Sequence, residues 1–153
     1  MIYFEDLEVG ATASFGAYHV TRDEVIEFAS RYDPQPFHLS DEAAAETQFG
    51  RLAASSWHTA AMTIAMTVAH WDAHPQAGLG SPGLDELRWV KPVYPGDTLR
   101  CETVLLSKRV SATRLGIGIT KSRTTVFNQD GETVMTFIAN GLIRTRTGAP
   151  DPE

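Results

Sequence analysis

The sequence lacks several features that would mark whole classes of protein. It contains a single cysteine, Cys101, so no disulfide forms within the chain and an oxidising compartment gains no support. Basic residues are in the minority: 13 Lys and Arg against 19 Asp and Glu give a net charge of −6, which argues against nonspecific nucleic-acid binding. No uncharged apolar stretch approaches the roughly 20 residues of a membrane-spanning helix. The first residues are acidic where a signal peptide needs basic ones, so we expect a cytoplasmic protein.

What remains is the composition of an ordinary globular domain. Hydrophobic residues make up 42% and charged residues 21% of the 153 residues. A chain of this length buries roughly two thirds of its unfolded surface, and therefore needs no disulfide or structural metal to fold. We predict one domain over residues 1–146 and a flexible carboxy-terminal tail over 147–153.

Two helices are predicted in the first third of the chain. Apolar residues recur every three or four positions over 22–32, and Thr21 and Glu24 have the spacing of a capping box. Pro34 ends this helix, because the residue before a proline is pushed out of the helical region. Ser40 is placed to cap a second, short helix.

The rest of the sequence predicts one long helix followed by strands. About ten of the fifteen residues over 57–71 are apolar, which predicts a helix enclosed on most of its sides. Strand-like runs separated by turn signals follow. With one amino-terminal strand the predicted strands are 12–19, 85–92, 98–110, 114–127 and 133–145. The fold class is therefore α+β: about five mostly antiparallel strands wrapped around a long central helix, the hot-dog arrangement.

The densest chemical signal is a short proline-containing segment. Asp33 and His38 are five residues apart, with Pro34 and Pro36 between them. Prolines fix the backbone and exclude regular helix, so this bend can hold a carboxylate and an imidazole converging on one water molecule as an acid–base pair. The alternative is structural: Asp33 finishes a helix and His38 makes a buried hydrogen bond. Residue types alone favour the structural interpretation, and both stay open at this point.

A family resemblance bears on this choice. Residues 28–38, Phe-Ala-Ser-Arg-Tyr-Asp-Pro-Gln-Pro-Phe-His, resemble the signature of the MaoC-like dehydratases, which include the (R)-specific enoyl-CoA hydratases. That signature runs Asp, any residue, Asn, Pro, any residue, His. Gln35 stands at the Asn position, one methylene longer with the same amide. Further segments resemble the family in the same order along the chain: 4–10, 49–53 and 87–97.

The resemblance implies addition of water to a trans-2-enoyl-CoA, or the reverse dehydration of a 3-hydroxyacyl-CoA, as in fatty acid metabolism. By position, Asp33 and His38 would hold the catalytic water. The CoA thioester would be the substrate, with no metal or other cofactor. The family resemblance also implies a homodimer, or a larger assembly of dimers, with the CoA arm in a tunnel at the interface.

An enolate forms during this reaction, and unpaired amides at a helix amino terminus suit its oxyanion. Ser55 and Ser56 begin the long helix and are the candidates for this role, although Ser56 stands where related dehydratases usually have glycine. The alternative is that both serines only cap the helix. His58, one turn further, either lines the same site or is a buried histidine with a structural partner.

Two other functions stay open. A hot-dog thioesterase would hydrolyse the thioester, but such enzymes often place a carboxylate on or just before the long helix, and residues 55–70 contain no Asp or Glu. A non-catalytic acyl-CoA-binding module is the third possibility, and the presence of both Asp33 and His38 weighs against it.

Other candidate sites are weaker. His70 and His74 have the helical spacing of metal ligands, but no third ligand is suggested and Pro75 follows at once, so we interpret them as a helix end. Cys101 is interpreted as a packing residue. No Gly-x-Ser-x-Gly nucleophile motif is present.

Overall fold

The computed structural model describes residues 1–148 of the chain. The elements in chain order are β1 (Thr12–His19), α1 (Arg22–Tyr32), α2 (Asp41–Ala45), α3 (Ser56–Ala73), β2 (Gly78–Trp89), β3 (Thr98–Val110), β4 (Ile117–Phe127) and β5 (Thr133–Arg144), with 3-10 turns at Phe4–Asp6, Pro36–His38 and Arg146–Gly148. The last of these turns contains the first two residues of the predicted tail. The rest of that tail, 149–153, lies outside the described residues.

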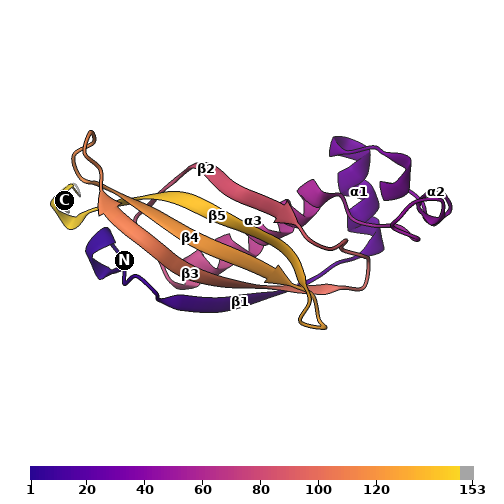
Figure 1. Cartoon of the computed structure of the whole chain (residues 1–153), viewed down its shortest axis with the longest axis horizontal. Coiled ribbons are helices and arrows are strands. Elements are labelled where there is room, and N and C mark those ends of the chain that lie inside the picture. Colours follow the sequence, from indigo (N-terminus) through magenta and orange to yellow (C-terminus); the bar gives the residue numbers. More distant parts are fainter. Residues whose placement is uncertain (149–153) are drawn as a thin grey trace.

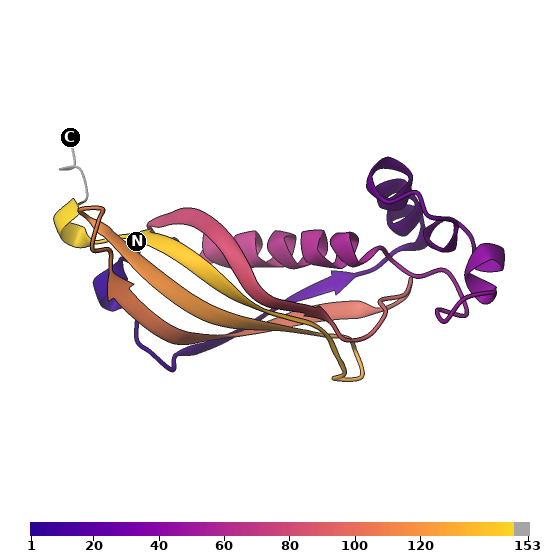
Figure 2. The ribbon, with the colours of Figure 1, turned by 45° about the horizontal axis from the view of Figure 1, so that its top comes forward.

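One five-stranded sheet, in the order β1-β3-β4-β5-β2, forms the body of the molecule. All four strand pairings are antiparallel. The sheet curves, and α3 lies along one of its faces (Figures 1 and 2). The predicted hot-dog fold is confirmed, with α3 as its central helix.

Local signals explain where the elements begin and end. The Thr21 hydroxyl accepts a hydrogen bond from the Glu24 amide at 3.3 Å, which is one half of the predicted capping box, and α1 ends just before Asp33. β4 and β5 are joined by a tight turn in which Gly131 has a φ of 74°, a conformation that favours glycine.

The core lies between the sheet and the inner face of α3. Met62 and Met66 of the helix pack against Leu99, Val126 and Met135 of the sheet. Cys101 is also buried there, and burial raises the pKa of its thiol to about 12. The thiol is therefore protonated at neutral pH, which fits packing and excludes a ready nucleophile.

The outer face of α3 differs from the sequence-based expectation. Trp57, Ile64, Val68 and Trp71 are 41–59% exposed, so the single chain does not enclose this helix on most of its sides. These residues recur along one face of α3 because of the helical repeat. Among residues 1–148, no helix is long and apolar enough to cross a membrane.

The first sheet-forming strand after α3 also differs from its prediction. β2 begins at Gly78, seven residues before the predicted start at 85, and ends at Trp89. The glycines and Pro82 in its first half have the composition of a turn. β2 is an edge strand with register shifts, however, and an edge strand tolerates proline and bulges.

The segment between β1 and α3 extends beyond the sheet. In Figure 2, α1 and α2 lie past one end of α3, and the amino terminus lies at the opposite end of the molecule. An exposed ion pair at 2.7 Å between Arg22 and Asp41 joins the starts of α1 and α2. The Asp33–His38 bend belongs to this extension, next to the amino terminus of α3.

Candidate active site

The Asp33–His38 bend is held by its own backbone hydrogen bonds. The Asp33 amide donates to Ala29 at 2.9 Å, the Gln35 amide to Asp33 at 2.8 Å, and the His38 amide to Gln35 at 2.9 Å. Pro36 starts the 3-10 turn, where its missing N–H and fixed φ cost nothing. The segment is therefore the rigid corner that its prolines predict.

The Asp33 carboxylate is held by two side-chain donors. Ser55 Oγ donates to Oδ2 at 2.7 Å, and Gln35 Nε2 donates to Oδ1 at 2.6 Å. Burial alone raises the pKa of Asp33, but the hydrogen bonds from Ser55 and Gln35 and the proximity of His38 outweigh it. The pKa of Asp33 consequently lies below its ordinary value of 3.8, and the group is a carboxylate at neutral pH.

The His38 ring is buried and oriented by the main chain. Its Nδ1 lies 2.7 Å from the carbonyl oxygen of Ala53, and a carbonyl can only accept, so Nδ1 carries the proton. The ring also packs against Phe37 and Phe49. In the neutral ring this tautomer leaves a lone pair on Nε2.

Nε2 of His38 and Oδ2 of Asp33 lie 3.4 Å apart. With His38 neutral, both atoms are hydrogen-bond acceptors, and a shared donor such as a water molecule satisfies the two together. The sequence predicted that these side chains converge, and the described geometry has them within reach of one small molecule.

Ser55 has two roles in this arrangement. It is the N-cap of α3, where its hydroxyl oxygen accepts from the Trp57 amide at 3.3 Å while the same hydroxyl donates to Asp33. Ser56 is the first residue of α3, and a first-turn amide has no acceptor within its own helix. The Ser56 amide, at the amino terminus of α3, is therefore without an intrahelical acceptor and follows directly after Ser55, which holds Asp33.

His58 is not brought to this pair. Its Nε2 lies 3.2 Å from Oε1 of Glu24, and its ring stacks on Phe28 with centroids 4.5 Å apart. Glu24 also accepts a hydrogen bond from the Tyr18 hydroxyl. Of the six candidate residues, Asp33, His38, Ser55 and Gln35 thus form one connected cluster with Ser56 next to it, while His58 belongs to a second cluster.

Sequence reasoning missed Glu24, Tyr18 and Arg31, which line the second cluster's pocket. A signal was available, because Glu24, Phe28 and Arg31 are four and three residues apart and so share one face of α1. Glu24 was interpreted only as a capping residue. The Ala53 carbonyl was missed because any residue type supplies one.

The remaining histidines do not form a metal site. Residues 1–148 hold no group of three or more His, Cys, Asp or Glu side chains positioned to bind a metal ion. The His70 ring stacks on Phe15 with centroids 4.4 Å apart and lies next to His74.

Comparisons with known proteins agree with the fold. The sequence profile of the family described as "MaoC like domain" matches residues 7–126. The crystal structure of a MaoC-like dehydratase from Rhodospirillum rubrum superimposes with a TM-score of 0.87 and 37% identity, covering 95% of this chain and 99% of that one. The similarity therefore spans nearly the whole of both chains.

Two relatives of named activity match over shorter regions. A mesaconyl-CoA hydratase of Cereibacter sphaeroides is 39% identical over 71 residues, which are 46% of this chain and 20% of that protein. A 3-hydroxybutyryl-CoA dehydratase of Methylorubrum extorquens is 39% identical over 67 residues, 43% of this chain and 42% of that protein. This chain thus spans less than half the length of either relative.

Proposed function

Because this chain belongs to the MaoC-like domain family, we propose that it is a hydro-lyase that adds water to a trans-2-enoyl-CoA or removes it from a 3-hydroxyacyl-CoA. Two relatives carry names of this chemistry, a hydratase and a dehydratase. The observation that carries the proposal is the convergence of Asp33 Oδ2 and His38 Nε2, 3.4 Å apart, at the amino terminus of α3.

In this proposal the Asp33–His38 pair handles the protons. A water molecule hydrogen-bonded to both acceptors attacks C3, so a C–O bond forms while the C2–C3 double bond breaks and its electrons move to the thioester oxygen. The pair takes one proton from this water and delivers a proton to C2, after which the thioester carbonyl reforms. Fixed positions for both groups reduce the entropic cost of assembling the transition state.

The enolate oxygen needs donors that are already in place. The amide of Ser56 and the positive end of the α3 dipole are our candidates, since charge that develops in the transition state is stabilised best by preoriented donors. Gln35 and Ser55 act on Asp33 in this scheme and keep it ionised. His58 has no part in the oxyanion site.

The proposed reaction needs no redox group, because water is added without any net change in oxidation state, and in this proposal the Asp33–His38 pair and the start of α3 supply the acid–base and electrostatic roles. The partner is a small acyl-CoA molecule. A location in the cytoplasm stays a prediction.

We also propose that the working unit is a homodimer. The exposed apolar face of α3 continues onto β2, where Trp89 contacts Trp57 edge to face with centroids 5.0 Å apart. β2 is a free edge strand whose residues, Leu79 and Leu84 among them, are almost all exposed. A second copy related by a two-fold axis would pair with this edge and cover the helix face at once.

A dimer of this kind predicts that Ile64→Asp yields monomers. The substitution places a charge in the centre of the apolar α3 face, where it would lose its hydration in the interface. Light scattering after size-exclusion chromatography measures the mass, with Val110→Asp, an equally exposed apolar position on β3, as the control. A wild-type chain that is monomeric at micromolar concentration contradicts the dimer.

The direct test of the reaction uses the purified chain and crotonyl-CoA. We expect loss of the absorbance of the conjugated enoyl thioester without release of free thiol. Appearance of free CoA would identify a thioesterase instead. Neither signal across straight, branched and dicarboxylic enoyl-CoAs would point to a binding module.

A further inference from the structure

The segment over residues 49–54 lies between α2 and α3 and is neither helix nor strand. Its last three residues are nevertheless buried, with Leu52 1%, Ala53 0% and Ala54 5% exposed. A buried backbone outside helices and sheets has to find its hydrogen-bond partners elsewhere, because an unpaired N–H or C=O group away from water is costly. The partners of these three residues therefore determine the course of the segment.

One carbonyl of this segment orients His38. The Ala53 oxygen accepts from His38 Nδ1 at 2.7 Å, and on the opposite side of the same peptide unit the Ala54 amide donates to the Val93 carbonyl at 2.8 Å. A peptide unit is planar, so these two hydrogen bonds together fix the direction of the Ala53 carbonyl. The tautomer of His38 depends on this direction, because the ring nitrogen that donates to the carbonyl is the one that carries the proton.

Asp41 holds the segment from the first turn of α2. Its Oδ1 accepts from the Leu52 amide at 2.9 Å, one residue before Ala53, and its Oδ2 pairs with Arg22 at 2.7 Å. The hydrogen bond from the Leu52 amide, together with that from Arg22, lowers the pKa of Asp41 below its ordinary value of 3.8. Asp41 is therefore a charged acceptor for the main chain at neutral pH.

Tyr94 holds the other end of the segment. Its hydroxyl donates to the Phe49 carbonyl at 2.8 Å, and the Phe49 ring packs against the His38 ring with centroids 5.7 Å apart. Tyr94 also follows Val93 directly, whose carbonyl holds the Ala54 amide. Residues 93 and 94 thus contact the segment at both of its ends, and each contact lies next to a group that touches His38.

We propose that Asp41 and Tyr94 are positioning residues for His38, which act through the 49–54 segment and keep Nε2 of the ring free to accept. Both act on the ring through main-chain groups of that segment. This inference rests on the proposed function only in giving Nε2 a part in the reaction. The tautomer of His38 is a property of the folded chain and can be measured without substrate.

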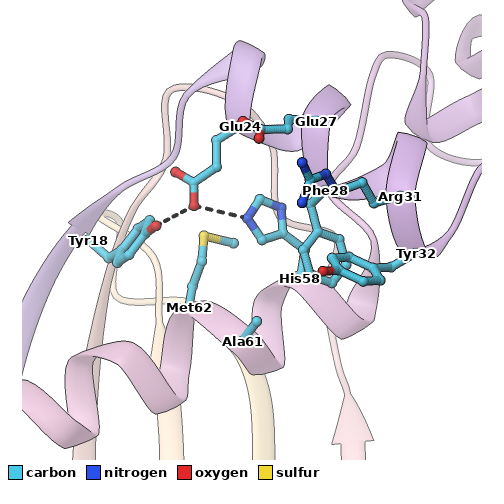
Figure 3. A pocket seen from close by; sticks show the side chains of 9 residues that line it. All are labelled: Tyr18, Glu24, Glu27, Phe28, Arg31, Tyr32, His58, Ala61 and Met62. Carbon is cyan, nitrogen blue, oxygen red and sulfur yellow. Dashed lines mark hydrogen bonds and ion pairs between the residues drawn. The ribbon is translucent and has the colours of Figure 1, made fainter.

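His58 provides a reference within the same molecule. Its Nε2 faces Glu24 at 3.2 Å, and Glu24 also accepts from the Tyr18 hydroxyl, as the dashed lines in Figure 3 show. A carboxylate can only accept, so this ring carries its proton on Nε2, opposite to His38. Its partners come from α1 and β1 and lie outside the 49–54 segment. A change confined to that segment should therefore leave the His58 ring as it is.

NMR of ¹⁵N-labelled histidine side chains measures the tautomer, because protonated and unprotonated ring nitrogens resonate far apart. The spectra are recorded at about pH 8.5, where an ordinary imidazole is neutral, and assigned by replacing each histidine in turn. We expect Asp41→Ala to shift His38 from the Nδ1–H form toward the Nε2–H form. Tyr94→Phe should cause a smaller shift in the same direction. Asp41→Asn should restore the wild-type signal, because an amide oxygen still accepts from the Leu52 amide.

Glu42→Ala and Tyr3→Phe are the matched controls. Glu42 is the exposed neighbour of Asp41 in α2, and Tyr3 lies near the amino terminus at the opposite end of the molecule. Both should leave His38 in its wild-type tautomer. Thermal unfolding shows which variants are folded, and Tyr94→Phe, which removes only a hydroxyl, keeps the test available if Asp41→Ala does not fold.

Two NMR results would overturn the inference. One is a His38 proton that stays on Nδ1 in every folded variant of Asp41 and Tyr94. The other is a shift that appears equally in the controls or at His58, because this would report a general loosening of the chain.

Turnover separates a positioning role from a purely structural one. If the reaction proceeds as proposed, Asp41→Ala should lower kcat for crotonyl-CoA about tenfold with KM unchanged, since the orientation of His38 matters after the substrate is bound. Arg22→Gln should have a smaller effect, because a half-exposed ion pair contributes little. A normal kcat in a variant whose His38 tautomer has shifted overturns the link to the reaction. A wild-type chain without turnover contradicts the proposed function instead, and the NMR result alone then decides whether Asp41 and Tyr94 position His38.

Discussion

Two carboxylate–histidine pairs lie near the beginning of α3, and they differ in how each histidine is held. His38 and Asp33 are 3.4 Å apart, and His58 and Glu24 are 3.2 Å apart. Both histidines are buried, at 4% and 2% exposure. By the distance within each pair and the burial of the histidine alone, the two pairs are equivalent candidates for acid–base chemistry.

The second nitrogen of each ring distinguishes them. Nδ1 of His38 donates to the Ala53 carbonyl, which leaves Nε2 as an acceptor facing the carboxylate. In the other pair, Nε2 faces a carboxylate that already accepts from Tyr18, and Nδ1 is buried without a partner in the described structure. The first pair is arranged to share an added molecule, whereas Nε2 of the second donates to its own carboxylate.

The largest expected effect is on turnover, which should fall much more when the first pair is changed than when the second is. Asp33→Asn removes a proton acceptor while keeping the size of the side chain, and we expect kcat to fall about 10²–10⁴-fold, the usual range for loss of an acid–base group. The matched change Glu24→Gln should cost less than about tenfold. Rates with crotonyl-CoA and circular dichroism spectra measure activity and folding. Equal losses in the two variants would show that the pairs are not distinguished as described.

A second prediction concerns the support of Asp33. Ser55→Ala removes a donor that lowers the pKa of this carboxyl and leaves the burial that raises it, so the acidic limb of the kcat/KM profile should move to higher pH. In wild type the lowered pKa stabilises the folded chain above pH 3.8, and this contribution is lost as pH falls through the lowered value. In Ser55→Ala that loss should begin at higher pH.

Thermal unfolding of wild type and Ser55→Ala between pH 3 and pH 7 measures the stability part. Ser40→Ala is the control, since Ser40 caps α2 in the same way without touching Asp33. An unmoved pH profile in Ser55→Ala would mean that Ser55 does not hold Asp33 ionised.

The smallest expected effect concerns Tyr18, whose hydroxyl donates to Glu24 of the second pair. Burial, together with the hydrogen bond to Glu24 and its charge, raises the pKa of Tyr18 from 10.0 to about 12. The neutral phenol therefore stabilises the folded chain below pH 10, and this contribution is lost as the pH rises toward 12. Tyr18→Phe should cost about 1 kcal/mol at pH 8, the value of one hydrogen bond.

At pH 11 the difference in unfolding free energy between wild type and Tyr18→Phe should shrink. Urea denaturation at the two pH values measures it, and Tyr3→Phe reports the background for a tyrosine without such a partner. A Tyr18→Phe difference that stays constant with pH would contradict the contact with Glu24.

The sequence was sufficient for the first pair and insufficient for the second. Asp33 and His38 lie close together on a bend that Pro34 and Pro36 predict. The backbone preferences of nearby residues are therefore enough to bring the two side chains together. Contact between His58 and Glu24 joins residues 34 positions apart and depends on how α1 crosses α3. No local pattern encodes that crossing, so the sequence left open whether His58 lines the reaction site or is a buried histidine with a structural partner, and the structure shows the second.

The same distinction holds for the fold. The bounds of α1 and β3 follow from caps, turns and alternation close by in the sequence. The start of β2 does not, because its glycines and Pro82 are acceptable only at a sheet edge, which is a property of strand order. The exposure of the outer face of α3 is likewise not set by the local sequence, because it depends on contacts with other chains.

The acceptor for His38 Nδ1 has a consequence for how this protein can change through mutation. It is a main-chain atom of Ala53, so no codon change at that position deletes it, and the tautomer of His38 is insulated from point substitutions there. Asp33 has no such insulation, since Ser55 and Gln35 are each one nucleotide change from losing their donors. Point mutations in homologous genes should therefore change activity through the contacts of Asp33 more readily than through the contact of the His38 ring with the main chain. The His38 contact can be tested by replacing the peptide bond after Ala53 with an ester, which weakens the Ala53 carbonyl as an acceptor.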